Sequence, residues 1–287
     1  MVSRKILVTG ANQGIGLALC KSLAKDHGCH VFLGARSAEK GQEAVQMVKE
    51  YAGDAAKVDL VVIDVTSEES VEKAAKTLKD QAVTLNAIVN NAATGISHGT
   101  DSATILNCNV FGPKRVVDNF LPLLEATGSR IVNVVSGAGP MYTRHQSEER
   151  QKLLCAPDSN VTWEQIEALA NGEGLMPGRK DLFPFDLPDG SYSLSKALLG
   201  AYTIMLAREH PNIMSYCLTP GYVATSMTSA LPGGKKPEDA LLPYMHCLFS
   251  DLGQETNGWF WGSDAKRSPL HVTRDPGTPE YDGKLPW

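Results

Sequence analysis

Short runs of apolar residues alternate along the chain with longer stretches in which apolar residues recur every three or four positions. A short apolar run indicates a strand buried in a sheet, and the longer period indicates an amphipathic helix. Strands are predicted at residues 6–9, 31–35, 58–63, 85–89, 131–135, 213–218 and 259–261, and helices at residues 15–26, 38–52, 68–80, 103–125 and 192–209. This alternation predicts an α/β fold with a doubly wound parallel sheet.

Residues 138–187 interrupt that alternation. The segment has no apolar run long enough for a strand, and its composition turns polar with several prolines. Thr162 and Gln165 form a capping-box pattern, in which each side chain bonds the other residue's backbone N–H, so a short helix is predicted to begin there. We expect a helical insertion within a single domain that spans residues 1–287.

The composition narrows the classes of function. The chain has 27 Lys plus Arg and 32 Asp plus Glu, a formal charge of −5, and no basic run, so binding to nucleic acid or to a membrane surface is not expected. Six scattered cysteines lack the spacing of a metal site and indicate reduced thiols in the core and at the surface. No apolar segment approaches the ~18 residues of a membrane span. We predict a cytoplasmic protein without a metal.

The segment TGANQGIG, residues 9–16, follows the first predicted strand and opens a helix. Gly10, Gly14 and Gly16 allow a tight turn and a close backbone approach to the free N–H groups of the helix start, which together suit a phosphate. Their spacing differs from the G-x-G-x-x-G fingerprint of dinucleotide sites, and an ordinary glycine-rich turn is the alternative. We expect the loop to bind a phosphate-bearing ligand.

Charged residues follow the next two predicted strands at the same sheet edge. Arg36 stands where an NAD site usually carries Asp or Glu for the ribose 2′-hydroxyl, and its guanidinium instead suits a 2′-phosphate, which favours NADPH. Lys40 adds positive charge, and the Asp64 carboxylate is placed to accept from an adenine amino group. The alternatives are solvated surface cations and an aspartate that caps a turn or helix.

Tyr192 and Lys196 stand one helical turn apart in the segment GSYSLSK. A nearby cation favours the phenolate and lowers the pKa of a tyrosine, which makes the phenol a better group for proton transfer. With 8 Tyr and 27 Lys plus Arg in the chain, such a pair is expected nearly once by chance. The pair therefore gains meaning only from the motifs around it.

Taken in order, the motifs resemble those of the short-chain dehydrogenase/reductase family, over nearly the whole chain. The set is TGANQGIG, Asp64, Asn90-Asn91-Ala92, Asn109, Ser136 after IVNVV, Tyr192-x-x-x-Lys196 and Pro220-Gly221. Within the family, the insertion before Tyr192, the NADPH-type Arg36 and the run RIVNVVSG are similar to the monomeric NADPH-dependent carbonyl reductases. The resemblance implies a Rossmann-type sheet, and we expect a monomer because the insertion would cover the helices through which most relatives pair.

The resemblance also implies a role for individual residues. Tyr192 would donate a proton to the substrate carbonyl, Ser136 would hold that oxygen, Lys196 would bind the nicotinamide ribose and lower the pKa of the tyrosine, and Asn109 would anchor a water. Asn90 and the backbone after it would line the cofactor groove. The implied cofactor residues are Gly10, Asn12, Gly14, Ile15, Gly16, Arg36, Lys40, Asp64, Val65, Asn91, Tyr192, Lys196, Pro220, Gly221, Val223 and Thr225. Those implied for the substrate are Ser136, Tyr192 and Tyr222.

Alternatives exist for several of these residues. In the alternative for Ser136, it is only a serine at the end of a strand. In the alternative for Asn109, it kinks its own helix by competing for backbone hydrogen bonds, and in that for Thr225, it caps a helix. The chain departs from the family pattern at Ala93, where glycine is usual, and in the shortened stretch between Asn91 and Asn109. The substrate cleft is therefore the least transferable part of the resemblance.

The resemblance implies NADPH-dependent reduction of aldehydes, ketones or quinones to alcohols. A dedicated dehydrogenase for a terpenoid, alkaloid or steroid ketone is the alternative within the family. A catalytically idle NADPH-binding regulator is the alternative of another class, because a fold does not fix a function. The expected partner in either enzymatic case is a small carbonyl compound.

Overall fold

The computed structural model describes residues 3–95, 98–183, 186–229 and 233–287. Within them one sheet has the strand order β3-β2-β1-β4-β5-β6-β7-β8, in which β1 to β7 run parallel and β8 is antiparallel. The strands are β1 Lys5–Val8, β2 His30–Ala35, β3 Val58–Val62, β4 Ala87–Asn90, β5 Arg130–Val134, β6 Met214–Leu218, β7 Phe260–Trp261 and β8 Arg267–Ser268. The predicted doubly wound sheet is confirmed, and its order reverses between β1 and β4, where ligands bind in such folds.

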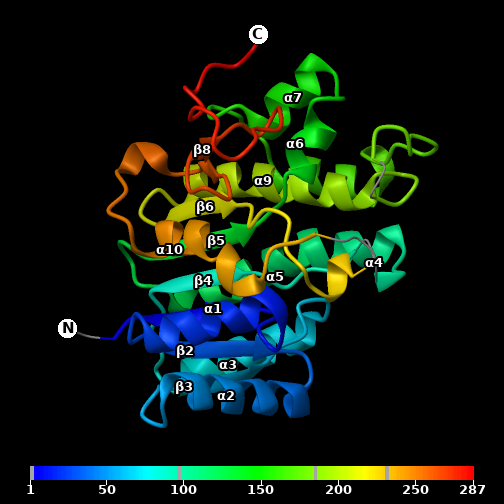
Figure 1. Cartoon of the computed structure of the whole chain (residues 1–287). Coiled ribbons are helices and arrows are strands. Elements are labelled where there is room, and N and C mark those ends of the chain that lie inside the picture. The colour runs from blue at the N-terminus through cyan, green and yellow to red at the C-terminus, as the bar shows by residue number, and fades with distance from the viewer. Residues whose placement is uncertain (1–2, 96–97, 184–185, 230–232) are drawn as a thin grey trace.

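Helices cover both faces of the sheet (Figure 1). Apolar side chains of α1, α2 and α10 pack on one face, and those of α3, α5 and α9 pack on the other. The helices are α1 Gly14–Lys25, α2 Ala38–Ala52, α3 Glu68–Asp80, α4 Ser102–Leu106, α5 Gly112–Phe120, α6 Ala138–Thr143, α7 Glu148–Cys155, α8 Trp163–Ala168, α9 Ser191–Glu209 and α10 Leu242–Phe249.

Strand β1 shows how the sequence pattern builds this core. Ile6 and Val8 belong to the apolar cluster under α1, α2 and α10, whereas Leu7 belongs to the cluster under α3, α5 and α9. All three are at most 1% exposed, and burying each such side chain contributes about 1.5–3 kcal/mol. A continuous apolar run is thus required because neighbouring residues face opposite, equally buried layers.

The helix predicted at residues 103–125 is broken in the structure. It consists of α4, a π-helical turn over Asn107–Phe111, α5 and a 3-10 turn over Leu121–Leu123. Pro113 lacks the backbone N–H that a continuous helix requires at this position. The π-helical turn, a feature frequent at functional sites, contains Asn109.

Segment 138–187 contains helices and, among its described residues, no strand; residues 184 and 185 lie outside the described part. Helix α8 begins at the predicted capping box, with both reciprocal bonds between Thr162 and Gln165 present. Helices α6, α7 and α8 pack against α9; Figure 1 labels α6 and α7 near α9. The Trp163 ring of α8 also meets Phe111 edge-on, with the ring centroids 5.8 Å apart. The segment therefore covers the helix that carries Tyr192.

Two elements near the C-terminus escaped the sequence analysis. Helix α10 has only eight residues, most of them apolar, so no amphipathic period marks it. Strand β8 has two residues and pairs with β7 at the sheet edge. Arg274 forms an ion pair with Asp264, their side chains 7% and 19% exposed, and this pair ties the C-terminal segment to the β7–β8 turn.

All six cysteines are buried, and none forms a disulfide. The expectation that some lie at the surface is wrong, and they act as small apolar side chains of the core. Burial raises the pKa of the Cys155 thiol to about 12. No helix in the described residues is long and apolar enough to cross a bilayer.

Candidate active site

A cavity of about 580 Å³ lies along the carboxyl ends of the central strands. It brings together residues from the glycine loop, from the ends of β2, β3, β4 and β5, from the start of α9 and from the chain after β6. Of the predicted cofactor residues it is lined by Gly10, Asn12, Gly14, Ile15, Gly16, Arg36, Lys40, Asp64, Val65, Asn91, Tyr192, Lys196, Pro220 and Thr225. Motifs far apart in the sequence therefore share one site.

The glycine loop leaves room that side chains would fill. Gly10 has a φ of 62°, and a Cβ on it would lie 2.7 Å from the Ala92 Cα. A Cβ on Gly16 would lie 2.6 Å from the Gly10 carbonyl oxygen. Gln13, the residue before α1, makes no side-chain cap, so the N–H groups of the helix start are available to an anion. The loop fits a dinucleotide phosphate.

Arg36 and Lys40 are exposed at the cavity and have Ser37 between them. The Ser37 hydroxyl caps α2 by accepting from the Lys40 N–H at 3.3 Å. In the described part of the chain neither cation forms an ion pair with a carboxylate. Two such cations beside a helix N-terminus favour a multiply charged anion.

Asp64 serves partly as a turn residue. Its Oδ1 accepts from the Thr66 N–H at 2.9 Å and from the Thr66 hydroxyl at 2.7 Å. The residue also lines the cavity beside Val65. The interpretation of Asp64 as a turn residue is therefore confirmed, while its contact with an adenine amino group stays a prediction.

The end of β4 is joined to the glycine loop by Thr9. The Thr9 hydroxyl accepts from the backbone N–H groups of Asn91 and Ala92, each at 3.1 Å, and the Asn91 amide donates to the Thr9 carbonyl at 2.9 Å. Asn90 instead points into the interior, where it is 3% exposed and donates to Asn133 at 2.8 Å. The expectation that Asn90 lines the cofactor groove is wrong, whereas Asn91 does line it.

Tyr192 is the second residue of α9 and is 8% exposed. Gly95, with a φ of 141°, lies so close that a Cβ on it would be 2.6 Å from the Tyr192 Cδ2. Burial raises the pKa of Tyr192 to about 12, a hydrogen bond with the Ser136 side chain lowers it, and the charge of Asp186 raises it. The net direction is opposite to the sequence expectation, because desolvation of the phenolate dominates.

Lys196 is 3% exposed and donates from Nζ to the Val134 carbonyl at 2.9 Å. Its Nζ lies 5.7 Å from the centroid of the Tyr192 ring. Burial lowers the pKa of Lys196 to about 8, against the opposing effect of Cys108. The predicted tyrosine and lysine are thus adjacent, and burial makes the ammonium less stable and the phenol harder to ionise.

Asn109 is fully buried and does not line the cavity. Its side chain accepts from the Thr94 N–H at 2.9 Å and donates to the Thr94 carbonyl at 2.9 Å. It also donates to the Ser195 hydroxyl at 3.1 Å. Asn109 therefore holds the chain that runs past the Tyr192 ring, and its side chain does not compete for the hydrogen bonds of its own helix.

Besides Asn109, four predicted residues do not border the cavity: Ser136, which is half-buried after β5, and Gly221, Tyr222 and Val223. Val223 is 3% exposed, Tyr222 is 43% exposed at the surface, and a Cβ on Gly221 would meet Ser263. Thr225 does border it and also caps the turn at residues 226–228. The substrate role expected for Tyr222 therefore stays a prediction from the resemblance.

The sequence analysis missed a chain of polar side chains beside the cavity. Gln13 donates to the Ser226 hydroxyl at 3.3 Å, Ser226 lies 3.5 Å from His98 Nε2, and His98 Nδ1 lies 3.0 Å from the Thr94 hydroxyl. All four residues line the cavity. No local motif marks them, because the contacts join residues far apart in the sequence.

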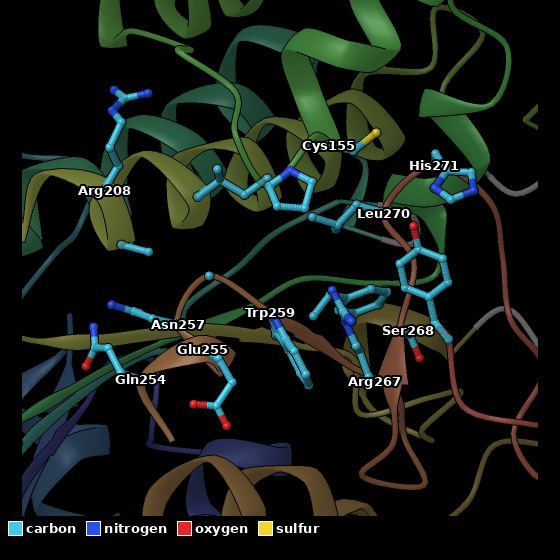
Figure 2. A pocket seen from close by; sticks show the side chains of 16 residues that line it. Cys155, Arg208, Gln254, Glu255, Asn257, Trp259, Arg267, Ser268, Leu270 and His271 are labelled. Carbon is cyan, nitrogen blue, oxygen red and sulfur yellow. The ribbon is translucent and has the colours of Figure 1, made fainter. Parts of the chain in front are cut away.

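A second cavity, of about 410 Å³, lies between the C-terminal half of α9 and the chain after α10 (Figure 2). Figure 2 shows Arg267 beside Trp259, and the guanidinium carbon lies 3.8 Å from the ring centroid. Across from them, Arg208 donates to the carbonyls of Ser159 and Val161, each at 2.7 Å. None of the predicted site residues lines this cavity, so the candidate active site is the first one.

Comparisons with known proteins identify the family of the chain. The sequence profile described as short chain dehydrogenase matches residues 4–148. The chain is 31% identical to a (+)-neomenthol dehydrogenase of Arabidopsis thaliana, over 86% of this chain and 96% of that protein. It is 27% identical to a carbonyl reductase (NADPH) 3 of Rattus norvegicus, over 89% and 95%. The solved structure of salutaridine reductase from Papaver somniferum matches with a TM-score of 0.73 and 27% identity, over 90% and 99%.

The profile, the full-length likeness to relatives and the motifs gathered in one cavity all point the same way, and the chain belongs to the short-chain dehydrogenase family.

Proposed function

We propose that the protein uses NADPH to reduce the carbonyl group of an aldehyde, ketone or quinone to an alcohol. The observation that supports this most is that the glycine loop and Arg36 border the same cavity as Tyr192 and Lys196. A nucleotide held along the loop would share that cavity with a proton donor. NADPH, when bound, supplies the hydride.

Tyr192 is the proposed proton donor. Because burial raises its pKa to about 12, the phenol is fully protonated at neutral pH. Ser136, which hydrogen-bonds the phenol, would also hold the substrate oxygen during the transfer. In this proposal the serine orients the donor and donates a hydrogen bond to the substrate oxygen, on which negative charge develops.

Lys196 supports that transfer electrostatically. With a pKa of about 8 it is mostly protonated at neutral pH, and its ammonium group lies 5.7 Å from the centre of the phenol ring. A cation at this distance stabilises the phenolate that remains after the proton has left. The bond from Nζ to the Val134 carbonyl keeps the ammonium in place.

Arg36 and Lys40 support a preference for NADPH over NADH. Their positive charges, without carboxylate partners in the described residues, suit a 2′-phosphate next to the start of α2. Charged hydrogen bonds of about 1.5–3 kcal/mol make the expected preference roughly ten- to a hundredfold.

Two named relatives support a narrower alternative, in which the substrate is a terpenoid or alkaloid ketone. They are the (+)-neomenthol dehydrogenase and the salutaridine reductase. Other residues that border the cavity, such as Thr94, His98 and Met227, do not follow from the family motifs. The alternative therefore differs from the main proposal only in the breadth of the accepted ketones.

The test measures loss of NADPH absorbance with quinones, isatin, aldehydes, menthone and polycyclic ketones, with NADH in parallel. Turnover of several unrelated carbonyl compounds supports the broad reductase, and turnover of one cyclic ketone alone supports the dedicated enzyme. Binding of NADPH without turnover of any compound favours the regulator and contradicts the proposal.

We also propose that the protein works as a monomer. Helices α6, α7 and α8 pack on α9, and the ammonium group of Lys114 on α5 lies 5.1 Å from the centre of the Trp163 ring. A partner chain could not reach these helix faces without displacing segment 138–187. Sedimentation velocity should give the 30.9 kDa mass of one chain, and a dimer or tetramer mass contradicts the proposal.

A further inference from the structure

Asp186 places a buried carboxylate at the start of the helix that carries Tyr192. The residue is 7% exposed, and its oxygens accept from three backbone N–H groups. The donors are Leu187 at 2.6 Å, Tyr192 at 3.0 Å and Ser193 at 2.7 Å. No motif marks this aspartate, which stands six residues before the tyrosine in segment 138–187.

The first turn of α9 needs such an acceptor. Gly190, which precedes the helix, has left-handed backbone angles and no side chain, so it supplies no cap. The free N–H groups of a buried helix start are costly unless they are bonded. Asp186 satisfies the N–H groups of Tyr192 and Ser193, and its negative charge interacts favourably with the positive end of the helix dipole.

We propose that Asp186 is a positioning residue for proton transfer, which fixes the backbone of Tyr192 and thereby the place of its hydroxyl in the cavity. This inference rests on the proposed function of Tyr192 as proton donor. Segment 138–187 then has a second role. Besides covering α9, the segment contacts the start of this helix and so becomes a part of the catalytic machinery. A lost bond at this position would displace the phenol relative to Ser136.

The charge of Asp186 also acts on the phenol. After burial, which raises the pKa of Tyr192 most, and the Ser136 hydrogen bond, which lowers it, the Asp186 carboxylate raises it further. The other ionisable groups near the phenol are Lys196 on α9 and Tyr244 on α10. Cys108, from the π-helical turn, acts on Lys196, and His98 borders the same cavity. Neutralising Asp186 should therefore make Tyr192 ionise at lower pH.

Asp189 provides a matched control. Its Oδ1 accepts from the Ser191 N–H of the same helix turn at 3.1 Å, and its Oδ2 accepts from the Ser102 hydroxyl. It therefore stabilises the same turn without bonding Tyr192, and it is not among the groups that act on the pKa of the tyrosine. Any effect of Asp186 that exceeds the effect of Asp189 reflects its contact with Tyr192 and not general capping.

The experiment compares Asp186→Asn with Asp189→Asn and wild type by three measurements. The first is tyrosinate absorbance after a jump to alkaline pH, read before unfolding and corrected with Tyr192→Phe. The second is kcat and KM for NADPH oxidation across pH, and the third is the midpoint of thermal unfolding. Asp186→Ser, which retains an N-capping hydroxyl, replaces Asp186→Asn if the latter does not fold.

We expect Asp186→Asn to ionise Tyr192 at lower pH, because the negative charge is lost. It should also lower kcat about tenfold or more, with KM for NADPH nearly unchanged, because the two oxygens that accept from three N–H groups become one oxygen and an NH2 donor. Asp189→Asn should lower the thermal midpoint alone. An unchanged ionisation of Tyr192 in Asp186→Asn, together with a loss of kcat no larger than in Asp189→Asn, overturns the inference. If wild type does not oxidise NADPH, the proposed function fails, while the ionisation of Tyr192 still decides whether Asp186 acts on the phenol.

Discussion

The two halves of the cavity are built on different physical principles. At the nucleotide half, Arg36 follows β2 directly and Lys40 lies in the first turn of α2; both are exposed, and each acts through its own charge in a solvated setting. At the catalytic half, Tyr192 and Lys196 are at most 8% exposed and depend on bonds from other segments. Under the proposed function, the first half sets which ligand binds and the second sets how protons move.

Desolvation explains why Tyr192 and Lys196 need several hydrogen-bond partners from other segments. Burial raises the pKa of Tyr192 to about 12 and lowers that of Lys196 to about 8, so both groups resist becoming charged. A charged form of either residue is stable only with a fixed hydrogen-bond partner, which is Ser136 for Tyr192 and the Val134 carbonyl for Lys196. A change to one buried group should therefore alter several properties, whereas a change at Arg36 should alter one.

Lys196→Met should have the largest effect among the changes that test this difference. The variant removes the buried charge beside the phenol and the bond to the Val134 carbonyl, so turnover should fall by about 10²–10³-fold. NADPH binding, measured by fluorescence titration, should weaken as well. Normal NADPH affinity in this variant would contradict a role for the lysine in both tasks.

Gly95→Ala should come next in size. Its Cβ would lie 2.6 Å from Tyr192 Cδ2, and Asn109 prevents the neighbouring Thr94 backbone from moving away. A displacement of the phenol by a fraction of an ångström to about 1 Å should lower kcat by up to about 10²-fold. The matched control is Gly99→Ala, where a Cβ meets nothing within 4 Å. Equal kinetics for the two variants would show that Gly95 does not hold the ring.

Arg36→Asp should change cofactor choice with little effect on chemistry. Loss of the cation and gain of a carboxylate should reduce the preference for NADPH by about ten- to a hundredfold, while kcat with saturating cofactor stays close to wild type. The ratio of kcat/KM for NADPH and NADH measures the effect. An unaltered ratio would assign the 2′-phosphate to other residues.

The last expected effect concerns stability and its dependence on pH, and it leaves the reaction itself unchanged. The pKa of Lys196 is lowered from 10.5 to about 8, so between these values the unfolded chain binds more protons than the folded one. The free energy of unfolding should therefore rise with pH across this window, by about 3 kcal/mol in total. Urea unfolding should show that the free energy of unfolding of wild type rises relative to that of Lys196→Met from pH 8 upward. A difference that is independent of pH would mean that the lysine is not desolvated.

The same contrast explains what the sequence could predict. Glycines at a strand end, Arg36 and the spacing of Tyr192 and Lys196 are local signals, and the structure brings them to one cavity. Asp186 carries no such signal, because its importance comes from a turn that folds it back onto the helix start.

Burial limits prediction in the same way. The interior position of Asn90 follows from its bond to Asn133, 43 residues away, and the raised pKa of Tyr192 follows from packing that no motif encodes. The break in the helix predicted at residues 103–125 depends partly on a local signal and partly on tertiary contacts. Pro113 was visible in the sequence as a helix breaker, but the π-helical turn before it depends on tertiary contacts.

We propose that Tyr192 donates the proton in a cavity whose other half binds the nucleotide. The decisive variant is Tyr192→Phe, with NADPH affinity and the rate of NADPH oxidation measured on the same preparation. We expect unchanged affinity and a loss of turnover of about 10²–10⁴-fold, because the ring remains and only the transferable proton is lost. Turnover equal to wild type would show that another group donates the proton.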